Sequence, residues 1–212
     1  MIVLGLTGSI GMGKTEAAKT FRRLNVPVFD ADAIVHKLLG KNGEAVADVS
    51  LLFPDAVHDG LVNRQTLGAM VFNQPDDLKR LEGILHPRVR RQEGGFLTRA
   101  SRRGEPLVVL DIPLLFESER EARYDATMVV SAPGFVQRGR VLRRPGMTPA
   151  KYAAILDRQL PDAEKRSRAD FVVPTGLGKR FSLRRIRHII TMLCRSPKSS
   201  FAASRRHRHL YA

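Results

Sequence analysis

Short apolar runs alternate with longer stretches of mixed apolar and polar residues along most of the chain. The runs are three to seven residues long, which is typical of strands that are buried on both faces of a parallel sheet. They cover residues 1–7, 26–29, 107–112, 126–131 and 171–173. This alternation predicts an α/β fold with a five-stranded parallel sheet and helices on both of its faces.

Apolar residues recur at helical spacing in the stretches between these runs. In residues 14–24, Ala18, Phe21 and Leu24 fall on one helical face, and residues 181–194 repeat the pattern with leucine and isoleucine. We expect both helices to cover the sheet.

Two longer segments interrupt this core in the prediction. Residues 32–103 contain no convincing strand, and residues 32–105 predict a helical insertion with breaks expected at Gly43, 54–60, Pro75 and Pro87. Residues 134–168 predict a helical, arginine-rich segment. The chain is then one domain over residues 1–194, whose core consists of residues 1–31, 106–133 and 169–194.

The net charge of +15 is distributed unevenly along the chain. Residues 1–170 hold 26 of the 36 basic residues and all 21 acidic ones, so the body is only mildly basic. Residues 195–212 turn to Ser, Arg, His and Ala, and this composition predicts a basic, disordered tail. The absence of tryptophan and the presence of only three tyrosines leave few stacking platforms for nucleic acid.

Other features of the composition exclude several classes of protein. A single cysteine, Cys194, excludes an internal disulfide framework and any multi-cysteine metal site. No apolar run approaches the ~20 residues that a bilayer span needs. The N-terminus carries no basic region of a signal peptide, so we expect a cytoplasmic protein without a membrane partner.

Residues 8–15 (GSIGMGKT) match the phosphate-loop pattern G-x-x-x-x-G-K-[ST] directly after a predicted strand and at the start of a predicted helix. Glycines let successive backbone N–H groups turn inward around phosphate oxygens. Lys14 can bridge the β- and γ-phosphates, and the Thr15 hydroxyl can ligate Mg²⁺. The alternative is a glycine-rich turn that binds nothing, but the motif and its context together favour a nucleoside triphosphate site.

Carboxylates follow two other predicted strands. Asp30 and Asp32 come after the second strand, where one of them could accept a proton from an acceptor hydroxyl or could simply cap a helix over residues 31–39. Asp111 ends the apolar run LVVL and is a candidate for binding Mg²⁺, with a strand-terminal cap as the alternative.

The motifs GLTGSIGMGKT, DADAIVH, His86-Pro87 and DIPLLFE, in this order and spacing, resemble the dephospho-CoA kinase family over about residues 1–190. The resemblance implies a P-loop kinase that phosphorylates the ribose 3′-hydroxyl of dephospho-CoA with Mg·ATP, the last step of coenzyme A synthesis. Residues 32–105 would then lie on the acceptor side, and residues 134–168 would form a lid.

The resemblance also implies roles for individual residues. Asp32 matches the family's candidate general base, and Lys14 and Arg140 complete the implied catalytic set. The acceptor would contact Asp32, His86, Leu114, Leu115 and Glu117. For His86, a proline-terminated helix end is the alternative. The implied ATP site comprises Gly11, Met12, Gly13, Lys14, Thr15, Glu16 and Arg144, and Thr15 and Asp111 would hold Mg²⁺. Gln159 and residues 165–168 are weaker candidates near the adenine or the CoA phosphates.

Two other functions fit parts of the sequence. Another small-molecule P-loop kinase, such as a nucleoside monophosphate or shikimate-type enzyme, shares the phosphate loop but lacks DIPLLFE and the long helical insertion. A nucleic-acid-binding ATPase would use the basic C-terminus as its electrostatic footprint. We expect small-molecule partners, no specific nucleic acid, and a monomer or weak homo-oligomer.

Overall fold

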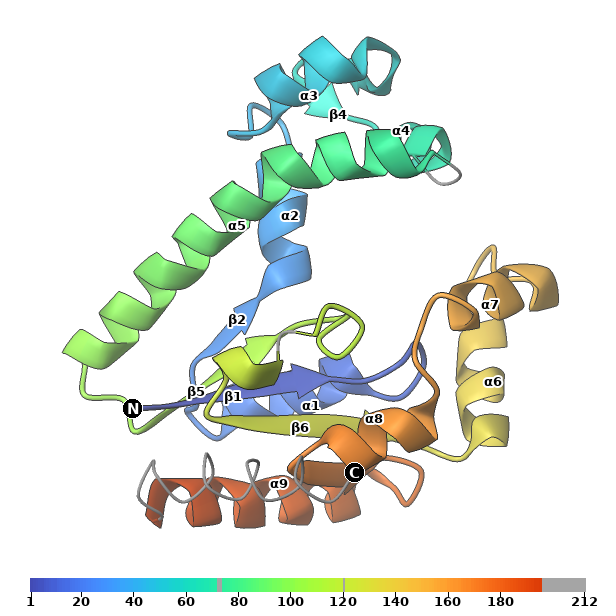
Figure 1. The fold of residues 1–212 in the computed structure, drawn as a ribbon. Coiled ribbons are helices and arrows are strands. Elements are labelled where there is room, and N and C mark those ends of the chain that lie inside the picture. The colour runs from blue at the N-terminus through green and yellow to red at the C-terminus, as the bar shows by residue number, and fades with distance from the viewer. Residues whose placement is uncertain (72–73, 120, 196–212) are drawn as a thin grey trace. The chain divides into compact units, whose positions relative to one another are not determined.

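The computed structural model describes residues 1–71, 74–119 and 121–195, and Figure 1 shows the order of its elements. The chain divides into two compact units, one formed by residues 1–29 together with the chain from residue 100, the other by residues 30–99. The predicted basic tail lies outside the described residues, apart from Arg195. Within the described ranges, none of the helices combines the length and apolar content needed to cross a bilayer.

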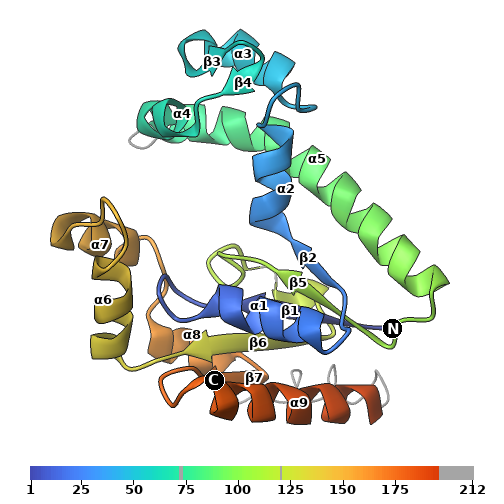
Figure 2. The same cartoon turned by 180° about the vertical axis from the view of Figure 1, so that it is seen from behind.

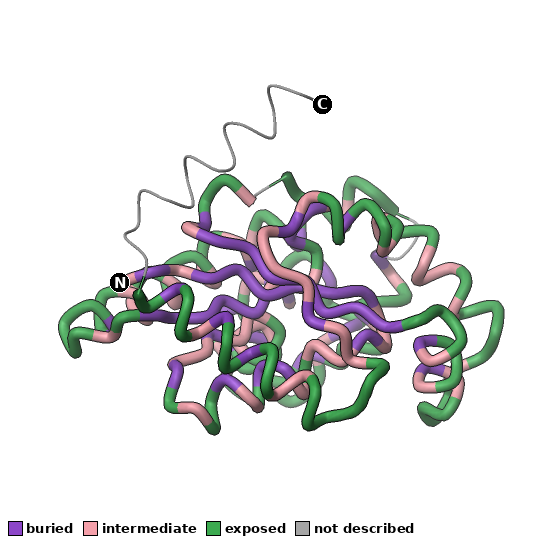
Figure 3. Tube along the Cα trace, turned by 90° about the horizontal axis from the view of Figure 1, so that it is seen from below, coloured by how far each residue is buried: buried purple, intermediate pink, exposed green. Residues whose placement is uncertain are grey.

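A five-stranded sheet forms the centre of the first unit, as the apolar runs predict. Its strands stand in the order β2-β5-β1-β6-β7, and β1 pairs in parallel with β5 and β6, as β6 does with β7. The strands β1, β5 and β6 are buried along most of their length (Figure 3). The bounds are β1 Ile2–Thr7, β2 Val28–Asp30, β5 Leu107–Asp111, β6 Ala126–Ser131 and β7 Phe171–Pro174.

The second strand begins later than its apolar run predicts. Pro27 has no N–H to donate to a ladder, although its carbonyl accepts a hydrogen bond from the Val109 N–H at 2.9 Å. Regular pairing therefore starts at Val28 and continues to Asp30.

Helices cover both faces of the sheet. Helices α1 (Lys14–Arg23) and α9 (Lys179–Arg195) share one hydrophobic cluster with the strands, which includes Phe21, Ile186 and Leu4. Figures 1 and 2, seen from opposite sides, show α8 (Asp162–Arg168) on the face away from α1. The predicted lid contains α6 (Gly134–Leu142) and α7 (Pro149–Leu156), and a short 3₁₀ helix, η2, covers Glu121–Arg123.

The second unit has its own hydrophobic cluster, which includes Leu38, Val49 and Leu81. The prediction of no strand in this region is wrong, because β3 (Val57–His58) and β4 (Leu61–Val62) form a small antiparallel hairpin. Asp59 and Gly60 turn it with φ values of 48° and 71°, and Asp-Gly is a preferred pair for such a turn. Its other elements are α2 Ala31–Leu38, α3 Val46–Leu52, η1 Pro54–Ala56, α4 Arg64–Val71 and most of α5 Pro75–Arg102, whose residues from Ala100 onward belong to the first unit.

The predicted break at Pro87 is also wrong, because α5 continues through this residue. The buried side chains of Leu81 and Leu85 hold the helix in the cluster on the N-terminal side of the proline. On its other side, Arg88 donates to the Ile84 carbonyl at 2.8 Å and forms an ion pair with Asp48 of α3. These anchors offset the loss of one backbone hydrogen bond at Pro87.

Candidate functional site

The phosphate loop connects the end of β1 to the start of α1, as its sequence predicts. Gly11 and Gly13 adopt positive φ values of 76° and 95°, which side-chain-bearing residues rarely adopt. A Cβ at Gly8 would lie 2.4 Å from a methyl group of Val130, so the loop passes too close to β6 for a larger residue. Gly13 precedes α1 and has no side-chain oxygen to cap it, which suits binding of an anion by the first N–H groups.

Lys14 and Asp111, predicted separately from two motifs, meet in the first unit. Their side chains form an ion pair with 2.7 Å between Lys14 Nζ and Asp111 Oδ1. Parallel pairing of β1 and β5 brings Asp111 opposite Leu6, and its side chain is only 4% exposed. Thr15 follows in the first turn of α1 and is exposed. The phosphate loop and the end of β5 therefore bring a lysine and a carboxylate into contact, and the Thr15 hydroxyl follows the lysine directly in the sequence.

Helix α6, which belongs to the predicted lid, and the loop after β7 both contact the backbone of the phosphate loop. Gln137 Nε2 donates to the Ile10 carbonyl at 2.8 Å, and Thr175 Oγ1 donates to the Met12 carbonyl at 2.6 Å. The Met12 side chain is buried, and its Sδ accepts from the Ala132 N–H at 3.0 Å. Only the backbone of Met12 therefore remains as a candidate for the predicted contact with ATP.

Arg140 belongs to the same set of contacts. It donates to the Gly11 carbonyl at 3.3 Å, to Thr175 Oγ1 at 3.0 Å and to the Thr175 carbonyl at 2.8 Å. These bonds tie α6 to both the phosphate loop and the end of β7. Arg144 lies two residues beyond the last residue of α6 and is exposed.

Glu16, expected to bind ATP, is engaged with two lysines. Its carboxylate lies 3.4 Å from Lys19 Nζ and 3.1 Å from Lys179 Nζ. The hydrogen bond from Lys179 is the main reason why the pKa of Glu16 is lowered. The side chain thus links α1 to α9, and only its backbone N–H remains as a candidate for ATP.

The DIPLLFE segment divides between surface and interior. Leu114 is 45% exposed, whereas Leu115 is fully buried and fills the space over Gly5, where a Cβ would lie 2.6 Å from it. Glu117 forms an ion pair with Lys165 at 2.6 Å and accepts from the Leu160 N–H at 3.1 Å. Of these candidates for acceptor contact, Leu114 is thus exposed, Leu115 is a core residue, and Glu117 faces the lid side.

Lys165 and Gln159 were the weakest of the predicted contacts with nucleotide or CoA phosphates. Lys165 is completely buried, so its ammonium group pairs with Glu117 instead of reaching solvent. Gln159 Oε1 accepts from the Ile10 N–H at 3.1 Å in the phosphate loop. Apolar patterning could not identify this use of Lys165, because a buried lysine follows only from its partner in the fold.

In the second unit, the structure distinguishes the carboxylate at the end of β2, Asp30, from the one that follows, Asp32. Asp30 is the N-cap of α2, and its Oδ1 accepts from the Ala33 N–H at 3.0 Å. Asp32 is an exposed residue of the first helical turn. His86 is half-buried inside α5 rather than at a helix end, so the alternative of a proline-terminated helix does not apply.

The oxygen donors near the phosphate loop suit Mg²⁺, which prefers carboxylate and hydroxyl oxygens. Among the residues that the structure describes, no cluster of three or more His, Cys, Asp or Glu side chains could hold a metal. A Mg²⁺ ion at Thr15 and Asp111 would thus take most of its ligands from phosphates and water, as is usual for this ion.

Comparisons with known proteins all point in one direction. The family model described as dephospho-CoA kinase (CoaE) matches residues 2–177. The dephospho-CoA kinase of Rhodospirillum rubrum is 54% identical over 193 residues, covering 90% of this chain and 91% of that protein. The dephospho-CoA kinase of Brucella melitensis is 51% identical over 201 residues, covering 94% and 99%.

Solved structures agree with the fold. TT1252 from Thermus thermophilus superposes with a TM-score of 0.80 at 36% identity and covers 90% of this chain and 96% of its own. A dephospho-CoA kinase from Campylobacter jejuni gives a TM-score of 0.62 with the same coverage. At 22% identity, this second likeness supports the fold alone.

Proposed function

This chain belongs to the dephospho-CoA kinase family, and from that premise we propose how its residues phosphorylate the ribose 3′-hydroxyl of dephospho-CoA with ATP, the last step of coenzyme A synthesis. The observation that carries the proposal is the Lys14–Asp111 pair at a complete phosphate loop. ATP is the donor, and the remaining question is what each side chain does.

On the donor side, the backbone N–H groups of the phosphate loop and of the first turn of α1 bind the ATP phosphates. Lys14 moves its charge from Asp111 to the β- and γ-phosphates as the nucleotide enters, since the two anions compete for one ammonium group. Thr15 and Asp111 are the residues that would hold Mg²⁺, which neutralises phosphate charge when bound. Glu16, Met12 and the glycines contribute backbone contacts.

On the acceptor side, Asp32 is the proposed general base. It accepts the proton of the 3′-hydroxyl while the hydroxyl oxygen forms a bond to the γ-phosphorus and the bond from that phosphorus to the β–γ bridging oxygen breaks. ADP and coenzyme A are the products. Support comes from the position of Asp32 two residues after β2, from Asp30 already serving as the helix cap, and from the family pattern.

His86, Leu114 and Glu117 remain proposed acceptor-side residues with different roles. Leu114, being exposed, can contact the acceptor directly. Glu117 acts indirectly, through the hydrogen bond that it accepts from the Leu160 N–H. Leu115 is buried in the core and supports the DIPLLFE segment by packing there. Arg140 and Arg144 supply positive charge from the lid, where water is excluded on closure.

The test is direct. Incubation of the purified chain with Mg·ATP and dephospho-CoA should give coenzyme A by mass spectrometry, and omission of Mg²⁺ should abolish it. Shikimate and nucleoside monophosphates serve as control acceptors and should release no ADP above background. ADP release with one of these and none with dephospho-CoA would overturn the proposal. A cytoplasmic location, a monomeric or weakly oligomeric state and a lack of specific nucleic-acid binding stay predictions.

A further inference from the structure

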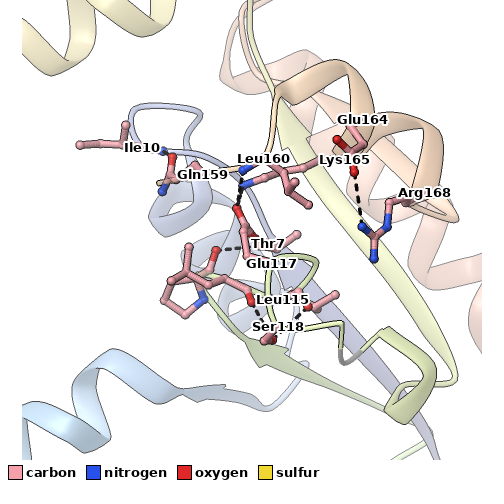
Figure 4. A network of polar contacts seen from close by, with 12 residues as sticks. Thr7, Ile10, Leu115, Glu117, Ser118, Gln159, Leu160, Glu164, Lys165 and Arg168 are labelled. Atoms are coloured by element: carbon pink, nitrogen blue, oxygen red, sulfur yellow. Dashed lines mark hydrogen bonds and ion pairs between the residues drawn. The ribbon is translucent and has the colours of Figure 1, made fainter. Parts of the chain in front are cut away.

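The residue pair Gln159–Leu160, which follows α7, touches both sides of the catalytic region of the first unit. The Gln159 side chain accepts from the Ile10 N–H of the phosphate loop at 3.1 Å. The adjacent Leu160 N–H donates to Glu117 Oε1 at 3.1 Å, in the segment that follows Asp111. Figure 4 shows these contacts converging on one short stretch of chain. Two adjacent residues of the predicted lid thus form hydrogen bonds with both the phosphate loop and the segment after Asp111.

Lys165 of α8 completes the arrangement from the interior. Its side chain is 0% exposed, and its Nζ lies 2.6 Å from the same Glu117 oxygen that Leu160 contacts. Glu117 Oε2 is also buried, with no hydrogen-bond partner in the described part of the chain. A buried charge of this kind is tolerated only beside an opposite charge. Lys165 therefore supplies the opposite charge beside the buried Glu117 carboxylate and holds that carboxylate where Leu160 contacts it.

A second ion pair between the same segments offers a contrast. Arg168 of α8 pairs with Glu121 of η2 and lies 5.2 Å from the centre of the Phe116 ring, and the Glu121 carboxylate raises the pKa of Arg168. This pair joins α8 to η2, with 3.1 Å between Arg168 Nε and Glu121 Oε1. It ties α8 to the chain after β5 without joining the two sides of the site.

We propose that Lys165 is a positioning residue that acts through Glu117 and Gln159–Leu160 to hold the phosphate loop and the segment after Asp111 at a fixed separation. Both segments adjoin the reacting groups, because Ile10 precedes Lys14 by four residues and Glu117 follows Asp111 by six. This inference rests on the proposed function and adds a residue to it. A displacement of about 1 Å at such a site can cost about 100-fold in rate.

The experiment separates positioning from stability. Lys165→Met should lower kcat for coenzyme A formation by about 10- to 100-fold and lower the melting temperature, since Glu117 loses its partner. The double variant Glu117→Gln with Lys165→Met removes both charges and should regain melting temperature, because neutral isosteres avoid the unpaired charge. Its kcat should stay low. Gln159→Met, which leaves the ion pair intact, should lower kcat with little change in melting temperature.

Glu121→Gln is the matched control, since it weakens the ion pair between Arg168 of α8 and η2 and should leave kcat within about twofold. Recovery of kcat together with melting temperature in the double variant would show a purely structural role and overturn the inference. An unaltered kcat in Gln159→Met, or an equal loss in Glu121→Gln, would also overturn it. The wild-type chain is assayed in parallel with dephospho-CoA, so failure of the proposed function would appear there, independently of these variants.

Discussion

At the scale of single residues, Lys14 carries the most direct consequence of the fold. Lys14→Ala removes the cation from the phosphates, and turnover should fall by about 10²- to 10⁴-fold, as for the loss of one preorganised electrostatic contact. Asp111, which is 4% exposed, also loses this partner, so the melting temperature should fall modestly as well. Lys19→Ala, on the exposed side of the same helix, is the control and should leave both unchanged. A loss below about tenfold for Lys14→Ala would contradict the phosphate-loop assignment.

Asp30, the last residue of β2, and Asp32, two residues further on, allow a matched comparison. Asp32→Asn keeps the side-chain shape but removes the proton acceptor, so turnover should fall by about 10²- to 10⁴-fold while ATP affinity measured by calorimetry barely changes. Asp30→Ala removes the N-cap of α2 and should cost about 1 kcal/mol of stability, measured by urea unfolding. If the two effects were exchanged between the variants, the assignment of base and cap would be reversed.

At the scale of elements, α6 joins the phosphate loop to the end of β7 through Arg140. Arg140→Ala loses the bonds to Gly11 and Thr175, so kcat should fall more than the KM for ATP rises. Arg143→Ala, at the exposed C-cap of the same helix, should have little effect on either constant. Equal losses in steady-state assays of the two variants would mean that charge alone, and not the contacts of Arg140, matters in the lid.

The β3–β4 hairpin gives a test of the second unit. Gly60 has a φ of 71°, and an added Cβ would lie 2.8 Å from Asn42 Oδ1, so Gly60→Ala should destabilise by about 1 kcal/mol or more. Gly68→Ala in α4 meets nothing within 4 Å and should stabilise by about 0.5–1 kcal/mol. Urea denaturation of both variants provides the measurement. A destabilised Gly68→Ala would argue against α4.

At the scale of the whole molecule, the sequence predicts a basic C-terminal tail, which lies outside the described residues apart from Arg195. Residues 196–212 hold four Lys and Arg, no acid and few apolar residues. A chain of this composition buries too little surface to add stability. Deleting it should leave the melting temperature and saturated turnover unchanged and should affect only apparent affinity for polyanionic substrates at low salt. A fall of several degrees in calorimetry would show that the segment docks on the folded protein.

Most of the fold could be predicted from local pattern. Each of the five apolar runs forms a strand. In a strand, a continuous apolar run places apolar side chains on both faces of the sheet, and both faces are buried only where helices cover them. The phosphate loop was equally evident, since its glycines specify a backbone shape by themselves. The break expected at Pro87 is wrong because local sequence does not decide the helix there. Leu81, Leu85 and Arg88 keep the helix continuous through contacts with residues that are distant in the sequence.

The sequence by itself determined the five strands of the central sheet, the phosphate loop and the carboxylates at the strand ends, since these depend on neighbouring residues and on the shape of the backbone. Only the tertiary structure decided which polar side chains meet. Lys14 pairs with Asp111 across 97 positions, and Glu117 pairs with Lys165 across a shorter but still long separation in the sequence. Such pairs have no local signature, because burial of a charge is stable only when the rest of the fold supplies its partner.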